Sequence, residues 1–184
     1  MNKAILSVLG QDRPGIVATI TAVLARQQCN IENVSQTILQ SQFAGIFVVS
    51  IPPNLSFKVV EQGLVKEMQA LHLSVQVKAV QDQEATLLPG DSEPFIITTE
   101  GPDRIGLVAG ITEIIAQYGA NITNLQAVFK GGDAPGDNIM IYEVDIPLSA
   151  DQKAFDRDLR QRATELSLDI SIQHRNIFEA INRI

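Results

Sequence analysis

The chain contains the same stretch of sequence twice. The segment Gly10-Gln11-Asp12-Arg13-Pro14-Gly15-Ile16-Val17-Ala18 recurs as Gly101-Pro102-Asp103-Arg104-Ile105-Gly106-Leu107-Val108-Ala109. The offset of 91 residues holds without a gap from Ala4 to Val34, so that it also aligns Asn30-Ile31 with Asn121-Ile122. Self-similarity over such a length indicates a duplicated domain. Two halves of this size are each long enough to form a small hydrophobic core.

The boundaries of the two copies follow from the same comparison. From Ile51-Pro52, which matches Ile146-Pro147, the offset is 95, so the second copy has gained four residues. The turn-forming run 131–137 contains the surplus, which predicts a lengthened hairpin loop. A polar stretch with Pro and Gly separates the copies and is typical of a linker. We therefore expect a first domain at 1–82, a linker at 83–93, and a second domain at 94–184 that ends in a short tail.

The hydrophobic pattern predicts the same element order in each copy. In the first copy, Ala4 to Leu9 is an apolar run typical of a strand, and a helix follows with Ile16, Ile20, Val23 and Leu24 on one face. Two β-rich segments, 31–40 and 44–51, indicate a hairpin joined at Ser41-Gln42.

A second helix and a last strand complete each copy. Asn54 or Ser56 is the expected cap of this helix in the first copy, and a capping box of Ser149 with Gln152 is expected in the second. The segments 73–77 and 168–172 alternate apolar and polar residues, as a strand with one wet face does. The predicted fold class is α+β, with two ferredoxin-like βαββαβ units that each carry a four-stranded antiparallel sheet.

The charge of the chain argues against direct contact with nucleic acid. The sequence holds 14 Lys and Arg against 21 Asp and Glu, and the excess of acid lies entirely in 91–184. Binding to a phosphate backbone needs clustered basic side chains, and the sequence shows no such cluster. No apolar run approaches the length of a membrane span, and a single cysteine, Cys29, cannot form an intrachain disulfide. We expect a protein of the cytoplasm, without membrane or nucleic-acid contact.

The residues shared by the two motifs suit the binding of a zwitterion. Free backbone N–H groups at a helix start attract a carboxylate, and a glycine there, Gly15 or Gly106, allows close approach. Asp12 and Asp103 offer a carboxylate to an α-ammonium group, while Asn30 and Asn121 offer both a donor and an acceptor. The predicted ligand-binding residues are Gly10, Asp12, Arg13, Pro14, Gly15, Asn30, Ile31, Asp103, Arg104, Gly106, Asn121 and Ile122.

The same residues also have purely structural explanations, which stay open. Asp12 and Asp103 suit helix caps, the glycines suit close packing of helix and sheet, and Asn30 and Asn121 suit a turn after a helix. Arg13 and Arg104 are of a type more often exposed or paired with acids than engaged with a ligand. His72 and His174 are not equivalent and have no partner at ligand spacing. We therefore predict neither catalytic residues, nor a metal site, nor a cofactor.

The motif residues resemble those of a known family. Gly-x-Asp-Arg-Pro-Gly-Ile-Val at Gly10 to Val17, followed by Cys29-Asn30-Ile31, resembles the ACT domain, a βαββαβ module that binds amino acids and regulates enzymes and transcription. A chain of two such modules is similar to the glycine cleavage system transcriptional repressor group. The resemblance implies a small amino acid ligand, of the glycine or serine class, held between the loop after strand one and the start of strand two. It also implies a protein partner, such as a DNA-binding activator, in place of DNA.

Three classes of function are compatible with these observations. The favoured hypothesis is a non-enzymatic amino-acid sensor that represses or modulates transcription through a protein partner. The second is an interaction module in which sheets pair without any ligand, and in both cases the uncovered sheet edges favour a homo-oligomer. The third is an enzyme, but the sequence outside the two copies offers only 175–184 as a place for catalytic residues.

Overall fold

The computed structural model describes residues 2–80, 91–128 and 138–176. The chain divides into two compact units, residues 1–84 and 85–184, and each unit is described by itself. The expected linker at 83–93 lies largely outside the described residues, and the expected long loop at 131–137 lies wholly outside them.

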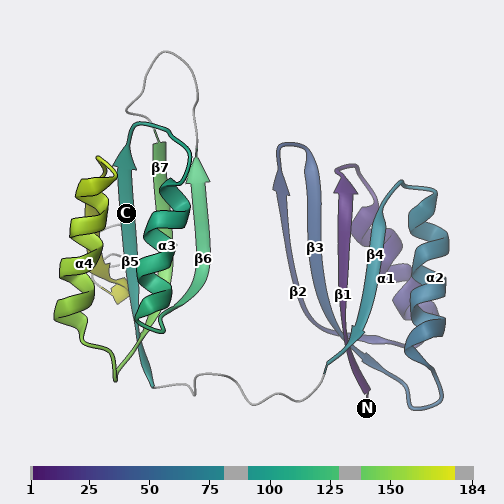
Figure 1. Ribbon diagram of the computed structural model, residues 1–184. Coiled ribbons are helices and arrows are strands. Elements are labelled where there is room, and N and C mark those ends of the chain that lie inside the picture. Colours follow the sequence, from purple (N-terminus) through teal and green to yellow (C-terminus); the bar gives the residue numbers. More distant parts are fainter. Residues whose placement is uncertain (1, 81–90, 129–137, 177–184) are drawn as a thin grey trace. The chain divides into compact units, whose positions relative to one another are not determined.

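Each unit has the element order predicted from the sequence (Figure 1). The elements of the first unit are β1 (Asn2–Gln11), α1 (Ile16–Arg26), β2 (Asn30–Leu39), β3 (Gln42–Ile51), α2 (Phe57–Gln69) and β4 (Ser74–Ala79). Those of the second are β5 (Ser92–Gly101), α3 (Leu107–Gln117), β6 (Asn121–Val128), β7 (Asn138–Pro147), α4 (Gln152–Glu165) and β8 (Asp169–His174). The prediction of two βαββαβ units is therefore confirmed.

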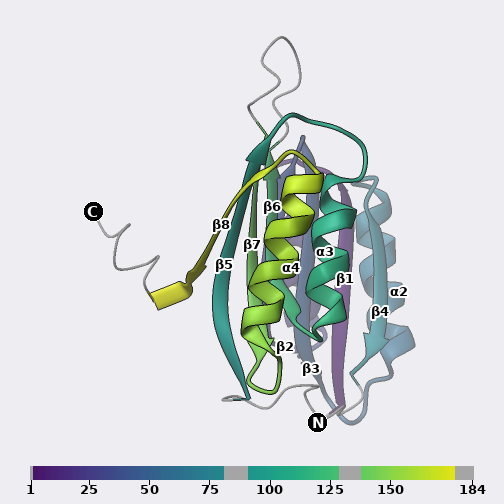
Figure 2. The ribbon, with the colours of Figure 1, turned by 60° about the vertical axis from the view of Figure 1, so that its left-hand side comes forward.

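Each unit consists of one sheet covered by two helices on one face. The strand orders are β2-β3-β1-β4 and β6-β7-β5-β8, and every neighbouring pair is antiparallel. Figure 2 shows α3 and α4 side by side across one face of the second sheet. Among the described residues of each unit, no helix of that unit covers the other face of its sheet.

The cores lie between helices and sheets, as the periodicity requires. In α1 the apolar stripe Ile16, Ile20, Val23 and Leu24 is fully buried, and the central strands β1 and β7 alternate buried residues with more exposed ones. In the second unit Phe155, Leu159 and Ala163 of α4 share one buried core with Tyr142 of β7. Burying such side chains contributes about 1.5–3 kcal/mol each, which explains why the apolar spacing alone predicts the elements.

Two local predictions were wrong in detail. The β2–β3 connection consists of Gln40 and Ser41, one residue earlier than expected, because both adopt positive φ (46° and 62°), the geometry of a tight two-residue hairpin turn. The cap of α4 is Asp151 rather than Ser149, and its carboxylate accepts from the backbone N–H groups of Lys153 and Ala154 at 3.1 and 3.0 Å. Ser56 caps α2 as expected, by accepting from Val59 N.

Candidate functional site

The motif begins with a glycine that a neighbouring turn overlies. A Cβ at Gly10 would lie 2.6 Å from Leu73 Cδ2, and one at Gly101 would lie 2.8 Å from both Leu168 Cδ2 and the backbone oxygen of Ser167. The turn before the last strand of each unit therefore packs against the end of the first strand. Gly10 and Gly101 serve this close packing of turn and strand, whereas the sequence had suggested close packing for Gly15 and Gly106.

The second glycine of each motif lies in open space at the start of a helix. Gly15 (φ 95°) and Gly106 (φ 96°) precede α1 and α3 in the left-handed conformation, and a Cβ at either would meet nothing within 4 Å. Glycine is needed there for its backbone conformation rather than for space.

The helix starts of the two motifs differ from the other two helix starts in having no side-chain cap. The first backbone bonds of α1 and α3 run from Thr19 N to Gly15 O and from Gly110 N to Gly106 O, both 2.9 Å long. The N–H groups of the first turn before Thr19 and Gly110 thus have no partner inside the helix. Among the described residues, no side chain caps either helix start. These donors and the helix dipole favour an anion at each position.

The acidic residues of the motifs do not cap the helices. Asp12 and Asp103 are exposed, and the structure gives neither carboxylate a hydrogen-bond or ion-pair partner among the described residues. The loop itself is held by Asp12 N, which donates to Ser41 O of the hairpin turn at 2.8 Å. The alternative in which Asp12 and Asp103 act only as caps is therefore excluded.

The two arginines of the motifs differ in their surroundings. Arg13 is half-buried, whereas Arg104 is exposed and donates through Nη2 to the Glu165 carbonyl oxygen at 3.3 Å. A cation beside the last carbonyls of α4 is stabilised by the helix dipole. Arg104 thus fits the structural explanation. Beside it, Ile105, which replaces Pro14, is fully exposed.

Within one unit, the asparagines lie far from the motif loops. Asn30 pairs with Ser50, which in turn pairs with Lys3 at the beginning of β1. Gly10 lies at the other end of β1, where it pairs with Phe43. Seven residues of strand correspond to roughly 20 Å. The reason is that α1 carries the chain back along the sheet before β2 begins. A single unit therefore does not bring Asn30 and Ile31 beside Asp12 and Gly15.

The second unit shows the same separation. Asn121 pairs with Asp145, which pairs with Pro94 at the beginning of β5, while Gly101 pairs with Asn138 at the other end. Asn121 and Ile122 therefore lie at the end of the sheet opposite Asp103, Arg104 and Gly106. The predicted ligand residues form two groups in each unit, a loop group and a strand-start group.

A polar cluster that the sequence did not indicate lies beside Asn30. The register of β2 shifts at a bulge between Ile31 and Asn33, which contains Glu32. Lys3 Nζ lies 2.7 Å from Glu32 Oε2. The Ser50 hydroxyl donates a hydrogen bond to Glu32 Oε1. The Lys3 and Ser50 hydrogen bonds hold the pKa of Glu32 below its ordinary value. The extra residue of a bulge leaves no mark in a β-strand pattern, so these contacts could not be foreseen.

The second unit has a different polar arrangement on the open face of its sheet. Arg175, just after β8, reaches Glu143 at 3.2 Å and Asp145 at 4.0 Å. Glu143 also accepts a hydrogen bond from Asn124 Nδ2 at 2.9 Å. The counterparts of Glu143 and Asp145 in the first unit are Val48 and Ser50, so the two sheets present different surfaces.

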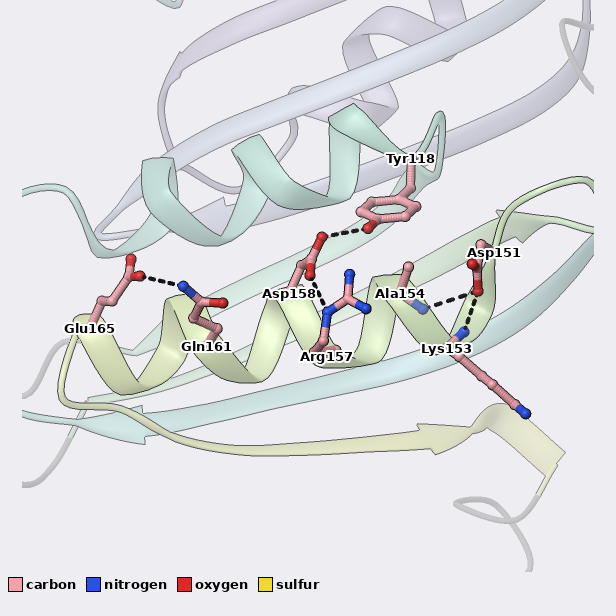
Figure 3. Close-up of polar contacts among 8 residues, drawn as sticks. All are labelled: Tyr118, Asp151, Lys153, Ala154, Arg157, Asp158, Gln161 and Glu165. Carbon is pink, nitrogen blue, oxygen red and sulfur yellow. Dashed lines mark hydrogen bonds and ion pairs between the residues drawn. The ribbon is translucent and has the colours of Figure 1, made fainter.

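The helix pair of the second unit is joined by a tyrosine and an aspartate (Figure 3). Tyr118 donates to Asp158 Oδ2 at 2.5 Å, and its ring meets Phe155 edge-on at 5.3 Å. This hydrogen bond raises the pKa of Tyr118 and lowers the pKa of Asp158. The corresponding pair in the first unit is Gln27 and Gly63. This contact joins the helices and lies outside the motif loops.

Other functional groups are sparse in the described part of the chain. Cys29 is a buried free thiol whose pKa is raised by burial. The described residues contain no group of three or more His, Cys, Asp or Glu side chains able to hold a metal ion. None of the described helices has both the length and the apolarity to cross a membrane.

Comparison with known proteins gives a family and a fold. The chain matches the family described as ACT domain over residues 2–78 and 93–173. A UPF0237 protein of Methanopyrus kandleri is 49% identical over 51 residues, which cover 28% of this chain and 57% of that protein. A UPF0237 protein of Methanocaldococcus jannaschii is 40% identical over 79 residues, which cover 42% of this chain and 88% of that protein.

Solved structures resemble the chain over almost its whole length. An unknown protein from Galdieria sulphuraria has a TM-score of 0.77 at 23% identity, with 94% of this chain and 98% of that chain covered. A protein described as a candidate glycine cleavage system transcriptional repressor has a TM-score of 0.71 at 17% identity, with 94% and 96% covered. At these identities the likeness concerns the fold.

Proposed function

Because this chain belongs to the ACT domain family, we propose that it is a non-enzymatic regulatory protein that senses a small amino acid. The ligand belongs to the glycine or serine class and binds at the start of α1, of α3, or of both. The observation that carries the proposal is that these two helix starts are open and uncapped, whereas α2 and α4 are closed by Ser56 and Asp151.

The chemistry of the loop group suits both charges of such a ligand. The first-turn N–H groups of α1, between Gly15 and Thr19, can donate to an α-carboxylate. The Asp12 carboxylate, which has no partner in the described chain, can accept from the α-ammonium group. Asp103 and the first turn of α3 repeat the arrangement. A small side chain on the ligand fits a position that is open to solvent.

We further propose that the ligand state is passed to a protein partner. The excess of acidic residues in 91–184 makes a DNA-binding activator a better partner than DNA itself. The two-unit neighbour described as a candidate glycine cleavage repressor supports the same proposal. A ligand changes partner binding only if it has different affinities for the free and the partner-bound protein. Repression of a glycine cleavage system is the specific form of this proposal.

Isothermal titration with glycine, serine and alanine tests the sensor proposal. We expect heat of binding from at least one of them, with weaker binding in Asp12→Asn or Asp103→Asn. Asp91→Asn is the matched control, because Asp91 is an exposed acid just before β5, at the end of the second sheet away from the motif loop. Absence of heat from all three amino acids, in protein with a cooperative unfolding transition, would refute the proposal.

The asparagine variants answer a separate question about this site. Asn30 lies at the opposite end of its sheet from Asp12, so Asn30→Ala leaves the affinity unchanged if the loop group of one molecule binds the ligand alone. Asn30→Ala could instead bind the ligand more weakly than wild type at high protein concentration but equally well after dilution. That result would indicate that a second molecule supplies the asparagine.

A ligand-independent assembly module is the second candidate function, and the surface of the first unit favours it. β2 is an edge strand whose apolar side chains Val34, Ile38 and Leu39 are 50%, 53% and 71% exposed. Ile5, Leu9 and Ile46 are also exposed, on the open face of the same sheet. Such an edge favours pairing with another strand.

Light scattering distinguishes assembly from sensing. An assembly module forms a homo-oligomer whose mass does not depend on glycine or serine, and Leu39→Lys reduces that mass. Asp12→Asn leaves the mass unchanged in this case. A monomer at all concentrations would exclude the assembly function.

A further inference from the structure

The second unit contains a pocket of about 500 Å³ under the first turns of α4, at the end of the sheet away from the motif loop. The floor of the pocket is apolar and is formed by Phe95 of β5, Ile146 of β7, Phe155 of α4 and Ile172 of β8. Its volume lies in the range of about 300–1,000 Å³ that is usual for small-molecule sites.

The first unit differs from the second at the corresponding place. The first residue of α2 is Phe57, which packs against the core, whereas the first residue of α4 is Gln152. Gln152 is exposed and donates to Glu93 Oε2 at 2.8 Å. On the strand side, Phe95 replaces Ala4. The aromatic ring that packs at the start of α2 is therefore replaced in α4 by an amide at the rim of the pocket.

Of the two charged residues that line the pocket, Lys153 and Asp156, only Lys153 has no partner among the described residues. Asp156 is held by Arg160, whose Nε and Nη2 donate to it at 2.9 and 3.0 Å. The Lys153 ammonium group has no ion-pair or hydrogen-bond partner within the described part of the chain. Figure 3 shows its side chain extended away from the axis of α4. A lone cation thus lies beside an apolar floor.

We propose that this pocket binds a small apolar carboxylate. The carboxylate group pairs with Lys153 Nζ, and an aromatic or branched hydrocarbon body covers Phe95 and Phe155. The edge-on contact of Phe95 with His174, at 5.3 Å between ring centres, fixes one wall. Asp156 is already paired with Arg160, and the Glu93 carboxylate already accepts from Gln152, so the pocket offers an ammonium group no acid without an existing partner. A monocarboxylate is therefore favoured over a zwitterion.

Binding of 3-phenylpropanoate and 4-methylpentanoate to the full chain tests the proposal. In methyl NMR spectra we expect shifts at Ile146 and Ile172, and the affinity follows from the titration. Lys153→Gln should weaken binding by about tenfold or more, as expected when a charge-assisted hydrogen bond is lost. The matched control is Lys58→Gln, the same change at the equivalent position of α2, which leaves the affinity unchanged.

A second variant tests the space in the pocket, and a neutral probe tests the charge of the ligand. Gln152→Phe restores the aromatic residue of the first unit and should abolish binding in a folded protein. The amide 3-phenylpropanamide should bind more weakly than the acid. Equal affinity in wild type and Lys153→Gln, shifts confined to residues outside the pocket, or no shift with either acid would overturn the proposal. Phenylalanine binding more tightly than 3-phenylpropanoate would also contradict it, since a zwitterion would then be preferred.

Discussion

The Tyr118 hydroxyl donates to Asp158 Oδ2 at 2.5 Å and so joins the last turn region of α3 to the middle of α4. Asp158 also accepts from Arg157 Nε at 2.9 Å. The first unit has no equivalent pair, since Gln27 there donates to the Val59 carbonyl oxygen. The duplicated fold therefore uses different polar contacts to fix the same two helices.

Tyr118→Phe should lower the melting temperature of the second unit in a pH-dependent way. The Tyr118 bond lowers the pKa of Asp158 and raises that of Tyr118. The aspartate contribution is present above its unfolded pKa of about 3.9 and is lost as pH falls through the folded value. The tyrosine contribution is present below about pH 10 and is lost as pH rises further. Calorimetry should thus show the largest difference from wild type near neutral pH, and a difference independent of pH would contradict the assignment.

Tyr142→Phe should make the second unit less sensitive to alkali. Burial raises the pKa of Tyr142 to about 12, whereas an unfolded tyrosine ionises near about 10. Between these values the unfolded chain loses a proton that the folded chain retains, so wild-type stability falls as pH rises. Denaturant titrations at neutral and alkaline pH measure this slope. Phe47 occupies the equivalent place in the first core, so phenylalanine fits the site, and an unchanged slope in the variant would argue against a buried phenol.

Asp151→Ala should destabilise the second unit, and Asp103→Ala should not. Asp151 accepts from two backbone N–H groups at the start of α4, and loss of such a cap costs about 1 kcal/mol. Asp103 precedes α3 without capping it. Free energies of unfolding from urea denaturation compare the two variants. Equal losses would mean that Asp103 has a structural role that the geometry does not show.

Gly101→Ala should be more harmful than Gly106→Ala. A Cβ at Gly101 meets the Ser167 carbonyl oxygen and the Leu168 side chain, and such overpacking costs about 2–3 kcal/mol. A Cβ at Gly106 meets no atom, so only the left-handed backbone opposes it, at about 1 kcal/mol. Denaturant unfolding of both variants shows which one loses more free energy of unfolding. A larger loss in Gly106→Ala would place the close contact at the helix start instead.

The fold was predictable because its signals are local. The stripe of Ile16, Ile20, Val23 and Leu24, and the alternation in the strands, depend only on the spacing of apolar residues along the chain. Caps and turns were less certain. Asp151 was missed in favour of Ser149, and the hairpin turn lay one residue from its expected place, because neighbouring polar residues compete for these positions with small energy differences.

The candidate site was predictable only in part. That Gly15 and Gly106 begin helices follows from the motif, and the structure adds that both helix starts are uncapped. The distance between Asp12 and Asn30 depends on how far α1 carries the chain along the sheet, which the motif does not contain. The Lys3, Glu32 and Ser50 cluster depends on a bulge, and the pocket at Phe95 depends on four elements meeting.

The amino-acid sequence by itself determined the duplication, the order of the elements and the residues that face each core, since these follow from periodicities within single segments. Only the tertiary structure decided which polar residues lie together. Strand pairing and helix packing join residues that are distant in the chain, so that Lys153 and Phe95 line one pocket while Asp12 and Asn30 lie at opposite ends of one sheet.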